Sequence, residues 1–233
     1  MLGELRSIGI TTPWAALQAL RNFARTVWDP TDADVRRGVN ALVYGALRDV
    51  DAERLREIET RQPAIAALFA ERYDPPLEPV RLERLPDGTL GREYARFLRA
   101  NGIDPLGELL EMPAPRNVAE YLFRRAYKLH DVLHVVLGCD ASVLGEVRIV
   151  SYSLGQAQGG AGNAARAPAL ALAVLFLHLA LRRPAEVAEA VRLAADWLRR
   201  GEREAAAGGY ASHRFEDWME QPLAEVRARV AAC

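Results

Sequence analysis

Apolar residues recur along most of the chain at spacings of three and four, the pattern typical of amphipathic helices. One such stripe comprises Val35, Val39, Leu42, Val43, Ala46 and Leu47. We find no run that alternates apolar and polar residues with the period of two expected of strands, and no internal repeat. The pattern therefore predicts an all-α fold, with residues 1–233 forming a single multi-helix domain.

Capping residues and helix breakers place the ends of the expected helices. Thr89 is expected to begin a helix that Asn101-Gly102 ends, and Gly138 is expected to close a long one. The stripe above belongs to a helix that Thr31 or Asp32 can cap. The other expected helices span about residues 14–27, 52–58, 64–73, 116–137, 142–156, 169–181, 185–200 and 215–230, with an extended, proline-rich connector over 74–88.

The segment 169–181 contains no charged residue and is almost entirely apolar. It is shorter than the roughly 20 residues that span a bilayer. Two interpretations remain open: a helix buried on all sides, or one wall of an apolar cavity between helices. His178 is the one ionisable residue in this segment, and we expect a hydrogen-bonded core histidine, with contact to a substrate as the second choice.

Charge and cysteine content exclude several classes of protein. Thirty basic against 31 acidic residues give a net charge of −1, so the basic excess of a nucleic-acid-binding protein is missing. Cys139 and Cys233 are too few for a disulfide framework or a cysteine-based zinc site. The first residues resemble neither a signal peptide nor a transit peptide, and we therefore expect a cytoplasmic protein.

Two of the four histidines, His130 and His134, lie four residues apart in the expected helix 116–137. At about 100° per residue, His130, His134 and Asp131 fall at about 0°, 40° and 100° around the helix axis. This arc adjoins the apolar stripe, so the cluster lies at the edge of the buried face. Arg124 and Tyr127 share the arc on earlier turns, as does Glu120.

The next expected helix carries Glu146 among apolar residues that face inward, Val143, Val150 and Leu154. An unpaired carboxylate there would cost several kcal/mol, so Glu146 requires a cation, a metal or a proton. The short turn 138–141 makes the two helices antiparallel neighbours, in a hairpin of about residues 116–157, and can bring Glu146 opposite the histidine pair.

Two imidazoles with one or two carboxylates suit a single divalent metal ion. Zinc is the first choice, with iron, manganese or cobalt as alternatives, and the expected ligands are His130, Asp131, His134 and Glu146. A histidine pair with ordinary hydrogen bonds is the competing interpretation. Cys139 is a further candidate ligand, although a small buried thiol explains it more simply.

Two classes of metallohydrolase share part of this pattern. Zinc peptidases carry His-Glu-x-x-His with the glutamate as general base. Here Asp131 is one methylene shorter, and Glu146 follows sooner than their third ligand usually does, so a metallohydrolase is a remote alternative. Phosphohydrolases with a His-Asp pair need an earlier histidine ligand; no histidine precedes His130, which excludes them.

His130-Asp131-x-x-His134, followed after eleven residues by Glu146, resembles the metal motif of the ubiquinone (coenzyme Q) biosynthesis protein four family. Residues 143–146 (VLGE) reproduce its glutamate segment, and residues 90–98 with the following Asn101-Gly102 are similar to its preceding helix and turn. Weaker likeness covers 59–73 and 222–227. The chain departs from the family at Leu133, often tryptophan there, and in the polar segment after Glu146 that includes Arg148 and residues 151–153.

The resemblance implies an all-α homodimer with a lipid-accommodating cavity, peripheral on the inner face of the membrane and associated with other quinone-biosynthesis enzymes. It also implies oxidative decarboxylation of a polyprenylated 4-hydroxybenzoate, in which a hydroxyl group replaces the C1 carboxyl group. The expected catalytic residues are His130, Asp131, His134 and Glu146. The expected substrate-binding residues are Arg124, for the carboxylate, and Tyr127, Leu175 and His178, with the apolar helix lining a prenyl slot.

A rival hypothesis is a non-catalytic scaffold that binds quinone lipid and partner enzymes and whose metal is structural. The two hypotheses differ in one respect that can be measured, because a scaffold tolerates substitution of the metal ligands as long as the fold persists.

Overall fold

The computed structural model describes residues 50–104, 113–158, 166–205 and 209–231, together with a few positions between 21 and 47. Its helices are α4 (Ala52–Arg61), α5 (Pro63–Ala70), α6 (Pro79–Leu82), α7 (Leu90–Asn101), α9 (Val118–Leu137), α10 (Val143–Gln158), α11 (Arg166–Arg182), α12 (Val187–Ala205) and α13 (Leu223–Ala231). Short 3₁₀ turns occur at Pro184–Glu186, Tyr210–Ser212 and Phe215–Trp218. The described residues contain no strand, only an isolated bridge between Thr89 and Pro222, which confirms the all-α prediction. The helices expected before residue 50 lie almost entirely outside the described residues.

Several helix ends are where the capping residues predict them. The Thr89 hydroxyl accepts a hydrogen bond from the Arg92 amide, and α7 ends at Gly102 with φ of 63°. Helix α9 ends at the expected Gly138 with φ of 72°, whereas its Asn117 cap places its start two residues after the expected residue 116. This left-handed conformation is readily available to glycine, so both helices stop where the sequence requires.

The structure differs from the expected helices in two segments. The connector 74–88 contains the one-turn helix α6, whose first position is Pro79, where the missing proline N–H costs nothing. The expected helix 215–230 is wrong in its first half, since the chain forms the 3₁₀ turn Phe215–Trp218 and α13 begins only at Leu223. Pro222 explains the break, because a proline disfavours helical conformation in the residue before it.

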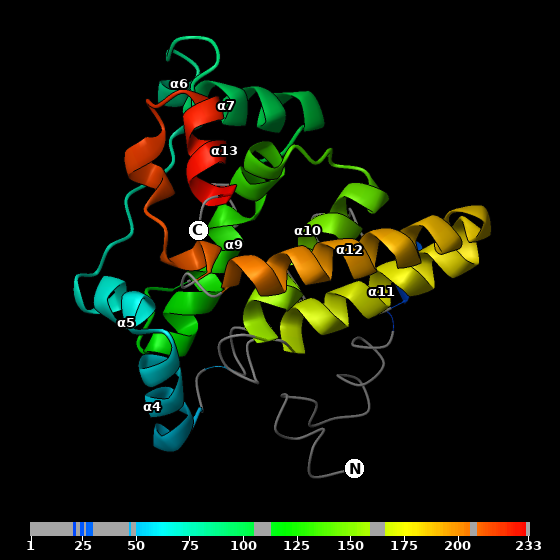
Figure 1. The fold of residues 1–233 in the computed structure, drawn as a ribbon, viewed down its shortest axis with the longest axis horizontal. Helices are drawn as coiled ribbons and strands as arrows, with labels where there is room; N and C mark the ends of the chain where they lie inside the picture. The colour runs from blue at the N-terminus through cyan, green and yellow to red at the C-terminus, as the bar shows by residue number, and fades with distance from the viewer. Residues whose placement is uncertain are drawn as a thin grey trace.

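Helix α9 runs through the centre of the molecule (Figure 1). Helices α7 and α13 cover its C-terminal half, and the apolar core there unites these three helices with α10. Helices α4 and α5 pack on its N-terminal half. Helices α11 and α12 extend to one side as a long hairpin against α10, and α10 crosses α12 so closely at Gly155 and Gly201 that a Cβ on either would lie 2.2 Å from a backbone oxygen.

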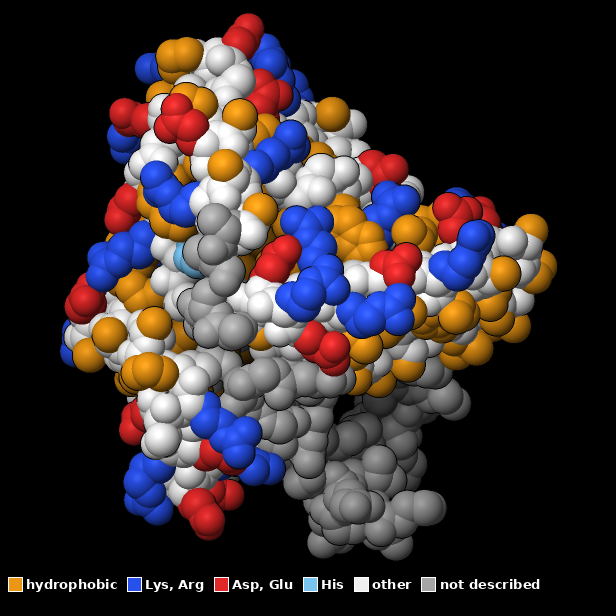
Figure 2. Space-filling model, viewed as in Figure 1, with side chains coloured by type: hydrophobic (Ala, Val, Ile, Leu, Met, Phe, Trp, Pro, Cys, Tyr) orange, Lys and Arg blue, Asp and Glu red, His pale blue; other side chains and the backbone are white. Residues whose placement is uncertain are grey.

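Helix α11 is buried on one face, which corrects the interpretation of a helix surrounded by protein. Leu175 and Leu179 pack in an apolar cluster with α10 and α12. Leu170 and Leu181, by contrast, are 54% and 64% exposed. Figure 2 shows hydrophobic side chains gathered along this hairpin. Among the described residues, α10 and α12 cover one side of α11, and Val27 and Trp28 contact it near His178 and Arg182, which composition does not reveal. Within the described residues, no helix combines the length and apolarity needed to cross a bilayer.

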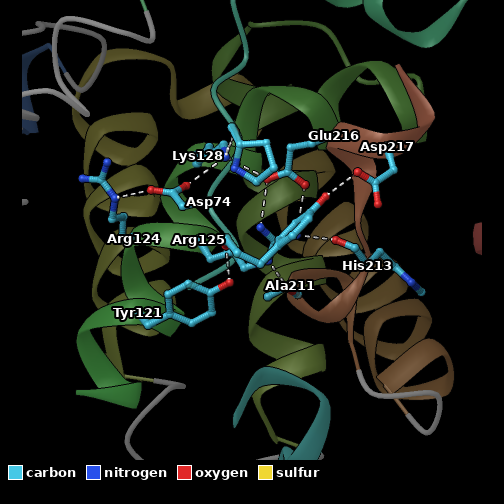
Figure 3. Close-up of polar contacts among 11 residues, drawn as sticks. Asp74, Tyr121, Arg124, Arg125, Lys128, Ala211, His213, Glu216 and Asp217 are labelled. Atoms are coloured by element: carbon cyan, nitrogen blue, oxygen red, sulfur yellow. Dashed lines mark hydrogen bonds and ion pairs between the residues drawn. The ribbon is translucent and has the colours of Figure 1, made fainter. Parts of the chain in front are cut away.

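A group of five charged residues, buried at its centre, ties distant segments to α9, and we call it the ion cluster (Figure 3). Its members are Asp74, Arg124, Arg125, Lys128 and Glu216. Glu216 accepts from Arg125 at 2.9 Å and lies 2.8 Å from the Lys128 ammonium group. Asp74 pairs with Lys128 and Arg124 at 2.9 and 3.0 Å. Arg125 also donates to the Ala211 carbonyl oxygen at 2.7 Å, so both the connector and the C-terminal segment are held against α9.

Candidate metal centre

The candidate site is built on the α9–α10 hairpin. His130 and His134 lie on the last two turns of α9, and Glu146 lies in the first turn of α10. Between the helices, Gly138 reverses the chain and Asp140 accepts from the Ser142 amide at 3.1 Å, at the start of α10. A tight turn with a local cap therefore sets the position of Glu146 relative to the two histidines.

The three side chains converge on one point. The Nε2 atom of His130 lies 3.1 Å from one Glu146 carboxylate oxygen, and the Nε2 atom of His134 lies 3.3 Å from the other. The two Nε2 atoms are 3.3 Å apart. Among the described residues, these three form a group whose candidate ligand atoms all lie within 4.8 Å of one another, and we call it the triad.

The triad fits a divalent metal ion. Two ligand atoms about 2.0–2.1 Å from a tetrahedral zinc are separated by about 3.3 Å, the distance observed between the two Nε2 atoms. The Nδ1 atom of His134 lies 2.9 Å from the Asp140 carbonyl oxygen, which can only accept, so Nδ1 carries the proton and Nε2 presents its lone pair. The donor set, two imidazoles and a carboxylate, is one that zinc and other first-row metals accept.

Burial differs across the triad. His134 is 1% exposed, and Phe97 of α7 stacks on its ring at 5.2 Å between centroids. His130 and Glu146 are 33% and 28% exposed, so the centre is open to solvent on their side. Burial by itself would raise the pKa of Glu146, but the positive charge and hydrogen bonds of His130 and His134, when these are protonated, outweigh burial and hold that pKa well below its ordinary value. Glu146 is therefore a carboxylate whenever a cation, either a proton on the histidines or a metal ion, occupies the triad.

Asp131, the fourth expected ligand, is not part of the triad. Burial and, after it, the charge of Asp131 raise the pKa of Tyr94 on α7. Its role as ligand or proton carrier stays a prediction. Cys139 is 5% exposed, and burial raises the pKa of its thiol to about 11, as expected of a small buried thiol rather than a ligand.

The residues expected to bind substrate have other neighbours in the structure. Arg124 pairs with Asp74 in the ion cluster. Leu175 packs in the apolar cluster beside α10, and the buried His178 places its Nδ1 atom 2.9 Å from the Val27 carbonyl oxygen. Tyr127 is half-buried on α9, one turn before His130. The structure groups none of them with the triad, and their substrate roles stay predictions.

Sequence reasoning missed two neighbours of His134: Phe97, which stacks on it, and the carbonyl of Asp140. The pattern Asp140-x-Ser142 before an expected helix signals a cap. No pattern signals the use of a backbone carbonyl, which every residue possesses.

Fold and site together define a class: an all-helical protein whose candidate metal centre comes from one antiparallel hairpin and contains two histidines and one carboxylate. A sequence model of the family described as coenzyme Q (ubiquinone) biosynthesis protein Coq4 matches residues 52–232, more than three quarters of the chain. The chain belongs to this family.

Individual relatives agree over shorter stretches. The mitochondrial ubiquinone biosynthesis protein COQ4 homolog of Rattus norvegicus is 36% identical over 101 residues, 40% of this chain and 36% of that protein. The Homo sapiens homolog is 35% identical over 101 residues, with the same coverage. The aligned part thus spans little more than a third of these relatives. A solved structure from Nostoc punctiforme, of a protein assigned to ubiquinone biosynthesis, shares the fold, with a TM-score of 0.62, 23% identity and coverage of 91% of this chain and 95% of that one.

Proposed function

We propose that the protein acts in ubiquinone biosynthesis and replaces the C1 carboxyl group of a polyprenylated 4-hydroxybenzoate by a hydroxyl group. Membership of the Coq4 family supports the pathway. The observation that carries the chemistry is the triad, whose ligand atoms converge on one point and which is open to solvent at His130 and Glu146.

The reaction breaks the bond between C1 and the carboxyl carbon, which leaves as carbon dioxide, and forms a bond between C1 and oxygen. Two electrons leave the organic substrate. We assign dioxygen as the oxidant that accepts them and becomes hydrogen peroxide, while water supplies the oxygen of the new hydroxyl group. A divalent ion at His130, His134 and Glu146 would supply Lewis acidity for the negative charge of the phenolic ring. Zinc fits the distances, and iron, manganese and cobalt accept the same ligands.

The chain's own residues supply binding and proton transfer. Asp131 is next to His130 in sequence but outside the triad, and we assign it the proton that leaves the substrate. The exposed apolar face of α11 suits a prenyl tail or the inner surface of a membrane, because Leu177 and Leu181 line an apolar hollow together with Val27 and Trp28. A homodimer and contact with other quinone-pathway enzymes complete the proposal.

Substitution of Asp131 tests the proposal. In a strain that lacks the gene, Asp131→Asn should accumulate the carboxylated prenyl intermediate, which purified wild-type protein should consume in the presence of oxygen. Asp196→Asn on α12 is the matched control, because this carboxylate is 67% exposed and, among the described residues, forms its ion pair with Arg199, which is itself 62% exposed. The proposal that the protein is an enzyme would be contradicted by two results together: normal quinone levels with Asp131→Asn, and a carboxylated ring that the wild-type protein leaves unchanged.

The scaffold is the second candidate, and the exposed apolar face of α11 favours it because such a face can also bind partner proteins. A scaffold predicts that His134→Ala, while folded, restores quinone synthesis in the same strain. The enzyme predicts that it does not.

A further inference from the structure

One residue of the hairpin turn, Asp140, contacts both helices of the candidate metal centre. Its carbonyl oxygen lies 2.9 Å from Nδ1 of His134, on α9. Its carboxylate accepts from the Ser142 amide at 3.1 Å and from the Ser142 hydroxyl at 2.5 Å. The same hydroxyl accepts from the Gly145 amide at 3.1 Å, directly before Glu146. A single turn residue is thus linked to one ligand directly and to another through the first turn of α10.

The place of this carbonyl depends on the residue at position 145. A Cβ atom on Gly145 would lie 1.9 Å from the Asp140 carbonyl oxygen and 2.5 Å from its carboxylate. Non-bonded carbon and oxygen atoms do not approach below about 3 Å, so any side chain there must displace the Asp140 backbone by about 1 Å. A displacement of that size removes the hydrogen bond to His134.

We infer that Asp140 is a positioning residue of the metal centre and that Gly145 is a glycine because only glycine admits the Asp140 carbonyl to its place beside His134. The inference rests on the metal centre of the proposed function. The carbonyl holds the proton of His134 on Nδ1, orients the ring and directs the Nε2 lone pair at the point shared with His130 and Glu146.

Gly145→Ala, compared with Gly155→Ala, tests the inference. Both glycines lie on α10 and both replacements meet a backbone oxygen, but the Cβ of Gly155 would meet Leu198 on α12, away from Asp140. The two variants therefore share the helix and the type of clash and differ in the carbonyl that moves. A glycine that serves only helix packing would give the same result at both positions.

The measurement is zinc affinity, by competition with a chromophoric chelator, and the visible spectrum of the cobalt-loaded proteins, with no quinone present. Gly145→Ala should bind zinc about 10–100-fold more weakly than wild type and give an altered cobalt spectrum. Gly155→Ala should bind zinc within about twofold of wild type and give an unchanged spectrum, although it lowers stability. Equal zinc affinities for the two variants would overturn the inference.

A second measurement uses the wild-type protein alone and does not depend on whether Gly145→Ala folds. Long-range proton–nitrogen correlation of the zinc-loaded protein should show His134 protonated at Nδ1 and zinc-bound through Nε2. Zinc bound through Nδ1 would overturn the inference. If the wild-type protein takes up neither zinc nor cobalt, the assignment of the metal centre is contradicted as well. Normal zinc binding without decarboxylation would contradict only the proposed reaction.

Discussion

Helix α9 carries residues of two groups of ionisable side chains, the ion cluster and the triad, and the two groups are satisfied in different ways. At about 100° per residue, Arg125 and Lys128 of the ion cluster lie about 170° around the axis from His130 and His134. In the ion cluster, cations and carboxylates alternate, and the Arg125 and Glu216 side chains are each 2% exposed. In the triad, two imidazole nitrogens and a carboxylate face one another, and no cationic side chain is a member.

This difference separates a structural group from a candidate binding site. Each cation of the ion cluster donates to a carboxylate of the chain, so the cluster is complete without a ligand. The triad is rich in electron pairs, since the Asp140 carbonyl retains the His134 proton on Nδ1 and leaves Nε2 as an acceptor opposite Glu146. A cation at this point removes the repulsion, which a metal ion does with the correct distances.

The largest expected difference between the ion cluster and the triad is in the free energy of unfolding, and it concerns Glu216. Glu216→Gln removes the carboxylate that neutralises Arg125 at the centre of the ion cluster, and breaking a buried ion pair in this way costs about 3–5 kcal/mol. Urea unfolding should report this loss. Asp217→Asn, its exposed neighbour, should cost less than about 1 kcal/mol. Zinc affinity of the folded Glu216→Gln protein should equal that of wild type, and a parallel loss of zinc would show that the two groups are coupled.

Zinc itself should produce the next largest effect, and only through the triad. Free zinc at 100 times its dissociation constant should raise the free energy of unfolding of the wild-type protein by about 2.7 kcal/mol, and a chelator should remove this increment. His134→Ala should keep its helical circular dichroism and show no such increment. Full zinc occupancy in His134→Ala would show that the triad is not the metal centre.

Acid should act on the ion cluster. Burial alone would raise the pKa of Glu216, but Arg125 and Lys128 hold it below the ordinary 4.5. Because the pKa is lower in the folded state, this carboxylate stabilises the fold above about pH 4.5, and the contribution is lost as the pH falls towards the lowered pKa. The loss is at most about 1.4 kcal/mol per pH unit from this group. The stability difference between wild type and Glu216→Gln should therefore shrink below pH 4.5 in urea titrations; a constant difference would contradict the assignment.

The smallest effect on zinc is expected at Asp131. This residue is outside the triad, so Asp131→Asn should change zinc affinity less than about tenfold, or about 1.4 kcal/mol, while it abolishes the proposed decarboxylation. A loss of zinc as large as that of His134→Ala would instead make Asp131 the fourth ligand. Chelator competition on the two purified variants distinguishes these outcomes.

Much of the candidate site follows from local periodicity. Helical spacing places His130 and His134 on one arc of α9, and the short turn closed by Gly138 brings Glu146 opposite them, as the structure confirms. Periodicity does not show which of the polar residues on that arc belong to the site. Arg124 falls in the same predicted arc, yet it pairs with Asp74, which is 50 residues earlier in the chain. Only the packing of the connector against α9 decides that partner.

The sequence by itself determined the helical class, the helix ends at Thr89 and Gly138, and the hairpin that carries the triad, because these depend on hydrogen bonds and periodicities within about twenty residues. The tertiary structure decided which face of α11 is exposed and which carbonyl orients His134. These features depend on contacts between helices and on backbone atoms, which are chemically the same in every residue and therefore leave no trace in the pattern of side chains.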